Sequence, residues 1–446
     1  MPNILKAINN IVWGPPLIVL ILSVGIYISI TTGFVQIRLF PKALKAFFRQ
    51  FKDRNKCDGV SPYRALCTAL AATVGTGNLA GVAGAIALGG PGAVFWMWVC
   101  ALFGMAIKFA EATLAVRYRN KSDTGYIGGP MYMICNGLHK KWHTLAYVYC
   151  FFGVVASFGI GNATQINTVM GGITELAQKC GWNLPIQTKV LIGGILGITL
   201  VALLLGGAQR VGKTTEMLVP FASLCYILAG VVVLIMRYNM IPTALKSIII
   251  GAATPKAVTG GAVGSVVLTM RIGTSRGIFT NEAGMGTASI AHAAGNVVKP
   301  GEQGLMGIVE VFLDTIVICT ITALVILCSG VPIPYGADVG VSLTERSFSA
   351  VLGDWVCIPL TVSLCVFAIA TVLGWGFYGA RCAQFLFGNG VWNKFVVLQG
   401  VVAIVGACLQ TGTVWVLSDI VNGLMAVPNL ITLMMLTPEL KNILRA

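Results

Sequence analysis

The chain has 446 residues, of which 56% are hydrophobic and only 10% are charged. Soluble globular domains carry about 25% charged residues, so this composition excludes a soluble domain and predicts an integral membrane protein. The net charge is +15, from 30 Lys and Arg against 15 Asp and Glu. In a membrane protein such an excess reports which loops face the cytoplasm, and it does not call for a nucleic-acid partner.

Apolar segments along the chain predict an all-α polytopic protein with about eleven transmembrane helices. The first segment is longer than the core of a signal peptide and no small-residue cleavage site follows it, so we expect it to be retained. The expected spans are 12–34, 62–88, 92–118, 143–176, 188–206, 215–236, 258–282, 303–328, 355–386, 394–412 and 415–436.

These spans group into four expected units. An additional N-terminal helix and a basic loop occupy 1–61, five-helix units occupy 62–236 and 237–436, and a tail occupies 437–446. Lys and Arg crowd the loops after the first and third spans, over 38–64 and 117–141. Because such loops stay in the cytoplasm, we expect a cell-membrane protein with its N-terminus outside and its C-terminus inside.

The second span is interrupted at its centre by Ala71–Asn78, which contains two glycines and a β-branched threonine. A break at mid-membrane is tolerated only where it is buried in protein or lines a cavity. It leaves helix-end N–H groups and carbonyls that bind an anion and a cation. The alternative is a glycine-rich face for helix packing.

A similar unit recurs in the second half of the chain. The glycine-containing stretch Arg271–Gly277 lies in the middle of the seventh span, where we expect a second break. Each interrupted span is followed by a span with a buried acid, Glu111 in one case and Asp314 in the other. The two interrupted spans, the second and the seventh, are five positions apart, which is an odd number, so the two units are inverted relative to each other. Paired interrupted spans in inverted halves indicate the binding site of a secondary transporter.

Residues near the first break have the chemistry to bind a zwitterionic amino acid. The backbone N–H groups around Thr76, Gly77 and Asn78 suit a carboxylate, and glycine lets the ligand approach closely. Asn162 and Gln165 share one face of the fourth span. Gln165 suits an ammonium group, although such amides also hold neighbouring helices together.

Walls for a small side-chain pocket are expected from two other spans. Trp375 lies one turn beyond Thr371 and near the middle of its span, which favours a pocket over an anchor at the membrane interface. Ile272, beside Gly273, is a further expected wall. A large indole and crowded aliphatic walls leave room for a small substrate only.

Two longer motifs resemble a known family. Gly89–Gly104, with the sequence GGPGAVFWMWVCALFG, closely resembles the signature of the sodium:alanine symporters, and Gly277–Gly286 is similar to the second strong motif of that family. The resemblance covers the whole chain. It implies the five-plus-five inverted-repeat fold of the leucine transporter and a symporter that imports alanine or glycine with sodium by alternating access.

The resemblance also implies a sodium site. Its ligands would be the carbonyls of Ala71, Val74 and Ala368 and the hydroxyl of Thr371. The alternative for that hydroxyl is a bond to a carbonyl of its own helix. Where the leucine transporter has an asparagine that binds a second sodium, this chain has Ala72. We therefore expect one cation per transport cycle.

Other readings remain open at this stage. Four acids in or beside spans are expected to form gating or structural ion pairs with Lys108, Arg271 or Arg276, because unpaired charges in a membrane are costly; they are Glu111, Glu282, Glu310 and Asp314. Proton coupling through one of them is an alternative to sodium. A passive channel would need a continuous polar stripe, which the spans do not show, and an enzyme would need a nucleophile, base or metal cluster within the spans, which the sparse histidines and acids do not supply. We expect no catalytic residue, no obligatory protein partner, and contacts with substrate and membrane lipid only.

Overall fold

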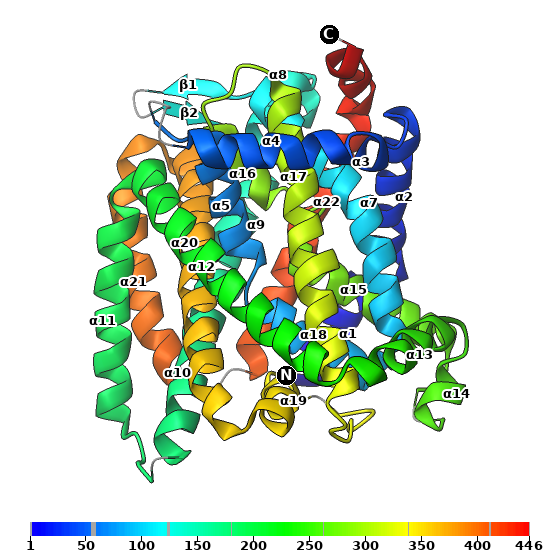
Figure 1. The fold of residues 1–446 in the computed structure, drawn as a ribbon. Helices are drawn as coiled ribbons and strands as arrows, with labels where there is room; N and C mark the ends of the chain where they lie inside the picture. The colour runs from blue at the N-terminus through cyan, green and yellow to red at the C-terminus, as the bar shows by residue number, and fades with distance from the viewer. Residues whose placement is uncertain are drawn as a thin grey trace.

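The computed structural model describes residues 2–54, 59–122, 125–179, 181–261, 263–337, 339–409 and 412–445. Helices make up almost all of this part of the chain, and most run alongside one another between two ends of a bundle (Figure 1). The prediction of a helical polytopic membrane protein is confirmed. The chain begins near the lower end in Figure 1 and finishes at the upper end.

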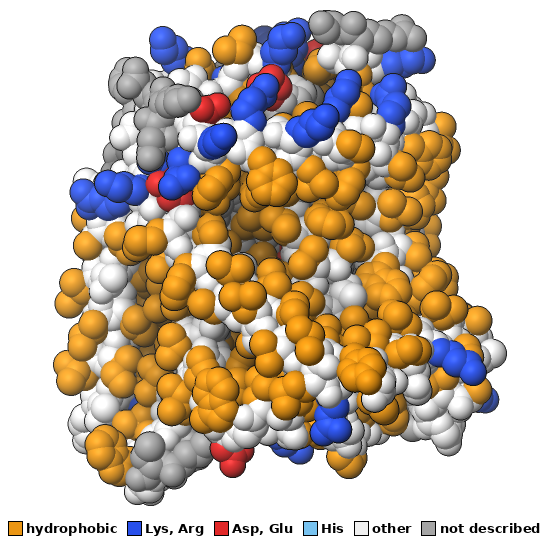
Figure 2. All heavy atoms as spheres, viewed as in Figure 1, with side chains coloured by type: hydrophobic (Ala, Val, Ile, Leu, Met, Phe, Trp, Pro, Cys, Tyr) orange, Lys and Arg blue, Asp and Glu red, His pale blue; other side chains and the backbone are white. Residues whose placement is uncertain are grey.

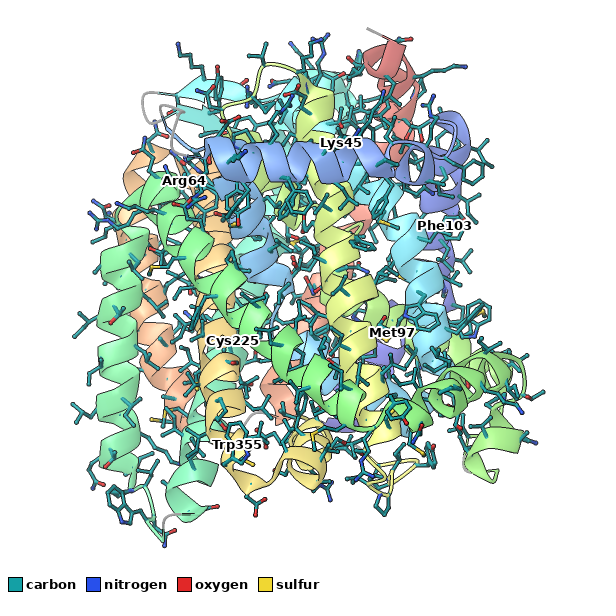
Figure 3. The ribbon with its side chains drawn as sticks, in the orientation of Figure 1. Lys45, Arg64, Met97, Phe103, Cys225 and Trp355 are labelled. Carbon is teal, nitrogen blue, oxygen red and sulfur yellow. The ribbon has the colours of Figure 1, made fainter. Side chains whose placement is uncertain are left out.

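The N-terminal unit forms four helices, α1 (Pro2–Val12), α2 (Pro15–Thr31), α3 (Val35–Arg38) and α4 (Phe40–Asp53). Helix α4 lies across the upper end of the bundle (Figure 1) and contacts α5 and α17, whose bounds follow. It buries Ala43 and Ala46 and carries Lys45 outward (Figure 3). On the face drawn in Figure 2, most Lys and Arg gather at this end above an apolar belt.

The first half of the bundle continues with α5 (Pro62–Thr73), η1 (Gly77–Gly81) and α6 (Val82–Gly89), which together form one span bent by 50°. Helix α7 (Gly92–Arg117) follows. The remaining elements of this half are the antiparallel strands β1 (Asn120–Ser122) and β2 (Gly125–Ile127), then α8 (Pro130–Gly137), η2 (Lys140–Trp142), α9 (Thr144–Phe158), η3 (Gly159–Ala163), α10 (Thr164–Lys179), α11 (Ile186–Leu204) and α12 (Gly207–Met236).

The second half contains another interrupted segment, α15 (Val266–Asn281) followed by α16 (Thr287–Ala294). Its other elements are η4 (Tyr238–Met240), α13 (Ile241–Ala253), α14 (Pro255–Thr259), α17 (Pro300–Val311), η5 (Phe312–Cys319), α18 (Thr320–Cys328), α19 (Ser342–Leu352), η6 (Asp354–Val356), α20 (Cys357–Phe387), η7 (Asn389–Val391), α21 (Trp392–Cys408) and α22 (Gly412–Arg445).

Within the described residues, eight helices are long and apolar enough to cross a membrane, and the bent pair α5 and α6 makes a ninth. The expected spans at 12–34 and 258–282 correspond to the shorter helices α2 and α15, of 17 and 16 residues. The predicted count of eleven is compatible with this arrangement and stays a prediction.

The two interrupted segments pack head to tail. Helix α5 contacts α16, and α6 contacts α15, so each first half lies against the second half of the other segment. Two inverted units would produce this arrangement. Helix α20 contacts α5 and η3, and it thereby brings Thr371 and Trp375 to the centre of the bundle.

Candidate functional site

The first break lies where the sequence predicts it. Helix α5 ends at Thr73, Val74 is extended, and the second half helix begins at Gly77. The side chain of Asn78 closes the gap, because its Oδ1 accepts a hydrogen bond from Gly75 N at 2.8 Å. Its Nδ2 donates to Asp314 Oδ1 at 2.7 Å, and its backbone N donates to Gly75 O at 3.2 Å. Asn78 therefore holds the break in shape.

The second break is not where the sequence predicts it. Helix α15 runs without interruption through Gly273 and Gly277 to Asn281. The chain then turns with positive φ at Glu282 (51°), Gly284 (93°) and Gly286 (77°). The expected break within 271–277 is wrong, and the interruption lies at 282–286.

Close helix packing explains the misplaced break. A Cβ on Gly273 would lie 2.2 Å from Ala93 O, and a Cβ on Gly277 would lie 3.3 Å from Met97 Cα. Both contacts are with α7, where small residues let two helix backbones approach. These glycines serve packing, which was the alternative reading for the first break.

A carboxylate from α7 supports the second break. Glu111 Oε1 accepts hydrogen bonds from Gly284 N and Gly286 N, each at 3.0 Å, and from Asn429 Nδ2 at 2.7 Å. Glu111 is fully buried. The second break thus depends on a carboxyl group of another helix, whereas Asn78 holds the first break from within.

A small buried cavity lies between the two breaks. Its volume is about 20 Å³, which is room for about one water molecule. It is lined by Ala72, Thr73, Gly75, Thr76, Gly77, Ile160, Gln165, Phe279, Glu282, Thr371, Trp375 and Asn422.

Five of the predicted site residues meet at this cavity: Thr76, Gly77, Gln165, Thr371 and Trp375. Thr76 Oγ1 donates to Gln165 Oε1 at 3.3 Å, which joins the first break to α10. The ring of Trp375 lies over the π-helical turn η3, where a Cβ on Gly161 would be only 2.4 Å from Trp375 Cβ. Glycine at that position lets the indole reach the cavity.

Four other predicted residues lie outside the lining. The side chain of Asn78 is occupied as described above, and Asn162 donates to the backbone oxygen and side chain of Gln399 on α21. Gly273 packs on α7. Ile272 lines a separate, larger cavity of about 230 Å³, which shares Phe279 with the small one.

Two of the expected sodium ligands are adjacent. Thr371 Oγ1 lies 3.0 Å from Ala71 O and 3.0 Å from Phe367 O, which belongs to its own helix. The bond to its own helix is therefore present beside a second bond to Ala71 O, and the sodium role of this hydroxyl stays a prediction. With its hydrogen directed to Phe367 O, the lone pairs of Thr371 remain available beside the Ala71 carbonyl. Val74 and Ala368 are buried.

The sequence missed several lining residues. Glu282 was expected only as a gating or structural acid, although its position beside two glycines was a usable signal. Its Oε1 accepts from Trp375 Nε1 at 2.9 Å and its Oε2 from the hydroxyl of Thr287 at 2.6 Å. Phe279, Ile160 and Asn422 reach the cavity through packing that no local pattern reveals.

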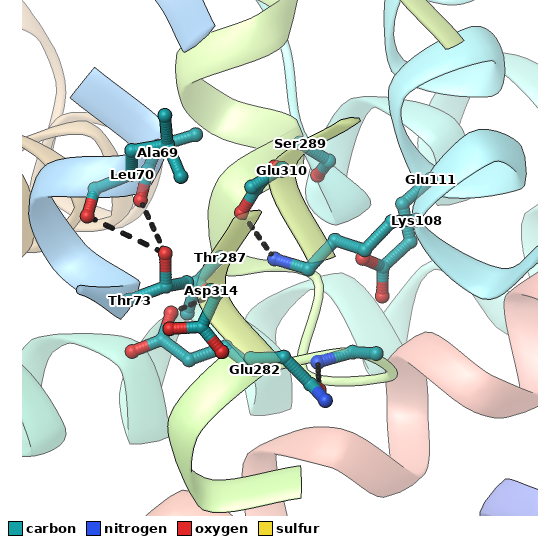
Figure 4. A network of polar contacts seen from close by, with 12 residues as sticks. Ala69, Leu70, Thr73, Lys108, Glu111, Glu282, Thr287, Ser289, Glu310 and Asp314 are labelled. Atoms are coloured by element: carbon teal, nitrogen blue, oxygen red, sulfur yellow. Dashed lines mark hydrogen bonds and ion pairs between the residues drawn. The ribbon is translucent and has the colours of Figure 1, made fainter. Parts of the chain in front are cut away.

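The other buried acids form a polar network beside the cavity (Figure 4). Lys108 Nζ and Glu310 Oε1 form an ion pair at 2.9 Å, and His292 Nε2 lies 2.9 Å from Glu310 Oε2. Asp314 instead accepts from the neutral groups of Asn78 and Thr315. The expected pairing with Lys108 thus holds for Glu310.

A helical membrane bundle in which two broken helices enclose a polar cavity has the architecture of a secondary transporter. The chain belongs to the sodium:alanine symporter family, which it matches over residues 1–446. Members of this family are transporters and not enzymes.

Individual relatives agree with this assignment. The chain is 42% identical to the sodium/alanine symporter AgcS of Methanococcus maripaludis over 440 residues, which cover 98% of this chain and 94% of AgcS. It is 34% identical to the amino-acid carrier protein AlsT of Bacillus subtilis, over 94% of this chain and 86% of AlsT. The crystal structure of MhsT in complex with L-phenylalanine has a similar fold, with a TM-score of 0.60 and 14% identity over 84% of this chain and 88% of MhsT.

Proposed function

We propose that this chain imports small neutral amino acids, alanine or glycine, together with sodium by alternating access. The observation that carries the proposal is the buried polar cavity between the two breaks, where a half helix begins on one side and α15 ends on the other. The name of the relative AgcS, a sodium/alanine symporter, supports the choice of substrate and ion.

The two helix ends match the two charges of an amino acid. The half helix that begins at Gly77 directs unpaired N–H groups and the positive end of its dipole towards the cavity, which favours the substrate carboxylate. Because the N–H of Asn78 is bonded to Gly75 O, this role falls to Thr76 and Gly77. The carbonyl end of α15 and the amide oxygen of Gln165 favour the ammonium group.

The walls of the cavity favour a small side chain. Trp375, Ile160 and Phe279 are its large apolar lining residues. A cavity of about 20 Å³ is smaller than any amino acid, so entry of alanine requires these walls to move. In our proposal Phe279, which the small cavity shares with the larger one, moves aside during entry.

Sodium is the co-transported substrate in this proposal. The Thr371 hydroxyl, the Ala71 carbonyl and the carbonyls of Val74 and Ala368 would hold it. We expect one sodium per cycle because Ala72, at the lining of the cavity, has no oxygen in its side chain. The Thr371 hydroxyl donates a hydrogen bond to Ala71 O at 3.0 Å, so two of the oxygens that would hold the ion already lie on neighbouring sides of one point.

The orientation follows from charge. We propose that the end with α4, where Lys and Arg gather in Figure 2, faces the cytoplasm, which puts the C-terminus inside and the N-terminus outside. The five-helix units 62–236 and 237–436 remain our proposed division of the chain. We also propose that transport requires no protein partner and that lipid surrounds the apolar belt.

Uptake into proteoliposomes tests the function. With sodium outside only, a symporter accumulates labelled alanine above the outside concentration, and dissipating the sodium gradient abolishes the accumulation. Accumulation driven by a proton gradient without sodium would mean that the coupling ion is the proton and not sodium. Simple equilibration of alanine in both conditions would indicate a passive channel and contradict the proposal.

A further inference from the structure

Among the described residues that line the small cavity, Glu282 alone has an ionisable side chain. It is 4% exposed. An ionised carboxylate at this depth is stable only when a positive charge or several hydrogen bonds compensate for the lost water. What balances Glu282 therefore bears on what the cavity binds.

An uncommon backbone conformation positions this carboxylate. Glu282 caps α15 in the left-handed region, with φ of 51°, and its N–H donates to Ile278 O at 2.8 Å. Residues other than glycine, asparagine and aspartate rarely adopt this conformation, and such outliers cluster at functional sites. The turn directs the side chain back to the end of α15, at the cavity.

Both groups that hydrogen-bond to the carboxylate are neutral. Trp375 Nε1 donates to Oε1 at 2.9 Å, and the Thr287 hydroxyl donates to Oε2 at 2.6 Å. Lys108 lies in the same region but forms its ion pair with Glu310, at 2.9 Å (Figure 4). Each carboxylate oxygen also has a further lone pair for an additional donor.

We propose that Glu282 binds the ammonium group of the substrate, and that this residue makes the α-amino group a requirement for transport. The inference rests on the proposed function. A zwitterion contributes no net charge and one sodium contributes +1, so a loaded site that contains ionised Glu282 is neutral. The carboxylate also repels acids that lack an amino group, because they would bring a second unbalanced negative charge into the cavity.

The test compares alanine and sodium binding by the detergent-purified full chain, measured as ligand-dependent thermal stabilisation. In Glu282→Gln the shape is kept and the charge is lost. Hydrogen bonds to charged groups are worth enough that the affinity for alanine should fall about 10- to 100-fold at saturating sodium. The affinity for sodium without alanine should change less than threefold.

Thr287→Val is the matched control, because it removes a hydrogen bond to Glu282 but keeps the charge. Because the charge that would face the ammonium group is kept, its alanine affinity should fall less than that of Glu282→Gln. Should Glu282→Gln fail to give folded protein, Glu282→Asp keeps the charge and shortens the side chain, and an intermediate loss of alanine affinity is expected.

Wild-type alanine binding is measured first, and its absence would contradict the proposed function itself. If the original chain binds alanine and Glu282→Gln binds it equally well, the proposal for Glu282 is wrong. It is also wrong if the variant loses sodium binding without alanine, since Glu282 would then be a sodium ligand, or if Thr287→Val loses alanine affinity to the same extent.

Discussion

The two broken helices meet at one cavity, yet they use glycine in different ways. In the first break Gly75 and Gly77 have no positive φ, and what they provide is space: a Cβ on Gly75 would lie 2.8 Å from Thr371 Oγ1. In the second break Gly284 and Gly286 have φ of 93° and 77°, so there glycine provides the backbone conformation.

A third use of glycine separates the two regions further. Gly273 precedes the second break by nine residues and serves the contact of α15 with α7. The first break should thus tolerate more substitutions, because its glycines only leave room for a side chain across the cavity. The second is fixed by backbone geometry and by a tightly packed helix before it. We expect substitutions around the second break to cost more.

Gly273→Ala should have the largest effect. The new Cβ would lie 2.2 Å from Ala93 O and 2.8 Å from Trp96 Cβ, and backbone on a packed helix cannot give way without separating α15 from α7. We expect a loss of about 3 kcal/mol in the free energy of unfolding, as for severe overpacking. Thermal unfolding in detergent measures it.

Gly84→Ala is the control, because nothing lies within 4 Å of a Cβ at Gly84 on α6. Alanine in a helix interior is favoured over glycine by about 0.5–1 kcal/mol, so this variant should be as stable as the original chain or more so. Equal stability of both variants would mean that α15 and α7 do not pack as described.

The supports of the two breaks should also differ in strength. Glu111→Ala removes the acceptor of three hydrogen bonds and leaves the N–H groups of Gly284 and Gly286 buried without a partner. We expect a loss of about 2–3 kcal/mol. Asn78→Ala removes the acceptor of Gly75 N and the donor to Asp314 Oδ1, while Asp314 keeps its bond from Thr315, and we expect a loss of about 1–2 kcal/mol.

Unfolding of both variants in the same detergent measures the ranking. A greater loss for Asn78→Ala would reverse it and would mean that the first break is the more constrained of the two.

The same contrast explains what the sequence can and cannot predict. The sequence predicts the first break correctly because Gly75 and Gly77 lie at the break itself. Before the second break, the conspicuous glycines Gly273 and Gly277 serve helix packing and not the break. Only the contacts of these glycines with α7 distinguish packing from a break, and the sequence does not contain those contacts. The helical class follows from the long apolar segments along the chain, since local hydropathy determines it.

Residues of the cavity divide in the same way. Local sequence patterns predict three of them: Thr76 and Gly77 lie in an interrupted span, and Gln165 is a polar amide within a span. Asn162 has the same signal as Gln165 and yet bonds to Gln399, because α21 lies on that face of η3. Asn422 has no signal at all, and it lines the cavity only because α22 packs beside the site. Long-range packing decides these cases.

Thr371→Val probes the first break from across the cavity. It keeps the shape of the side chain and removes the hydroxyl beside Ala71 O. If Thr371 is a sodium ligand, the sodium concentration for half-maximal alanine uptake should rise about tenfold, which corresponds to about 1.4 kcal/mol.

Thr361→Val is the matched control, since Thr361 is buried on the same helix but does not line the cavity. It should leave the sodium dependence unchanged. An unchanged dependence in Thr371→Val as well would remove Thr371 from the sodium site and leave only its bond to Phe367 O.

Trp375 probes the second break, one turn further along α20, and the expected effect is the smallest. Its ring lines the cavity and its Nε1 donates to Glu282, so Trp375→Ala should open space beside the substrate side chain and weaken the hold on the second break. One methyl group in an apolar pocket is worth about 1 kcal/mol at the lower end, or about fivefold, so the shift should be graded. Competition against labelled alanine by valine and leucine measures it, and the preference for these larger amino acids relative to alanine should rise.

Trp375→Phe separates the two roles of the indole, because it keeps most of the bulk and loses the N–H. It should retain the preference for small side chains while alanine affinity falls. If Trp375→Ala has the same competition profile as the original chain, the ring does not limit substrate size, and the limit must come from Ile160 or Phe279 on the remaining walls.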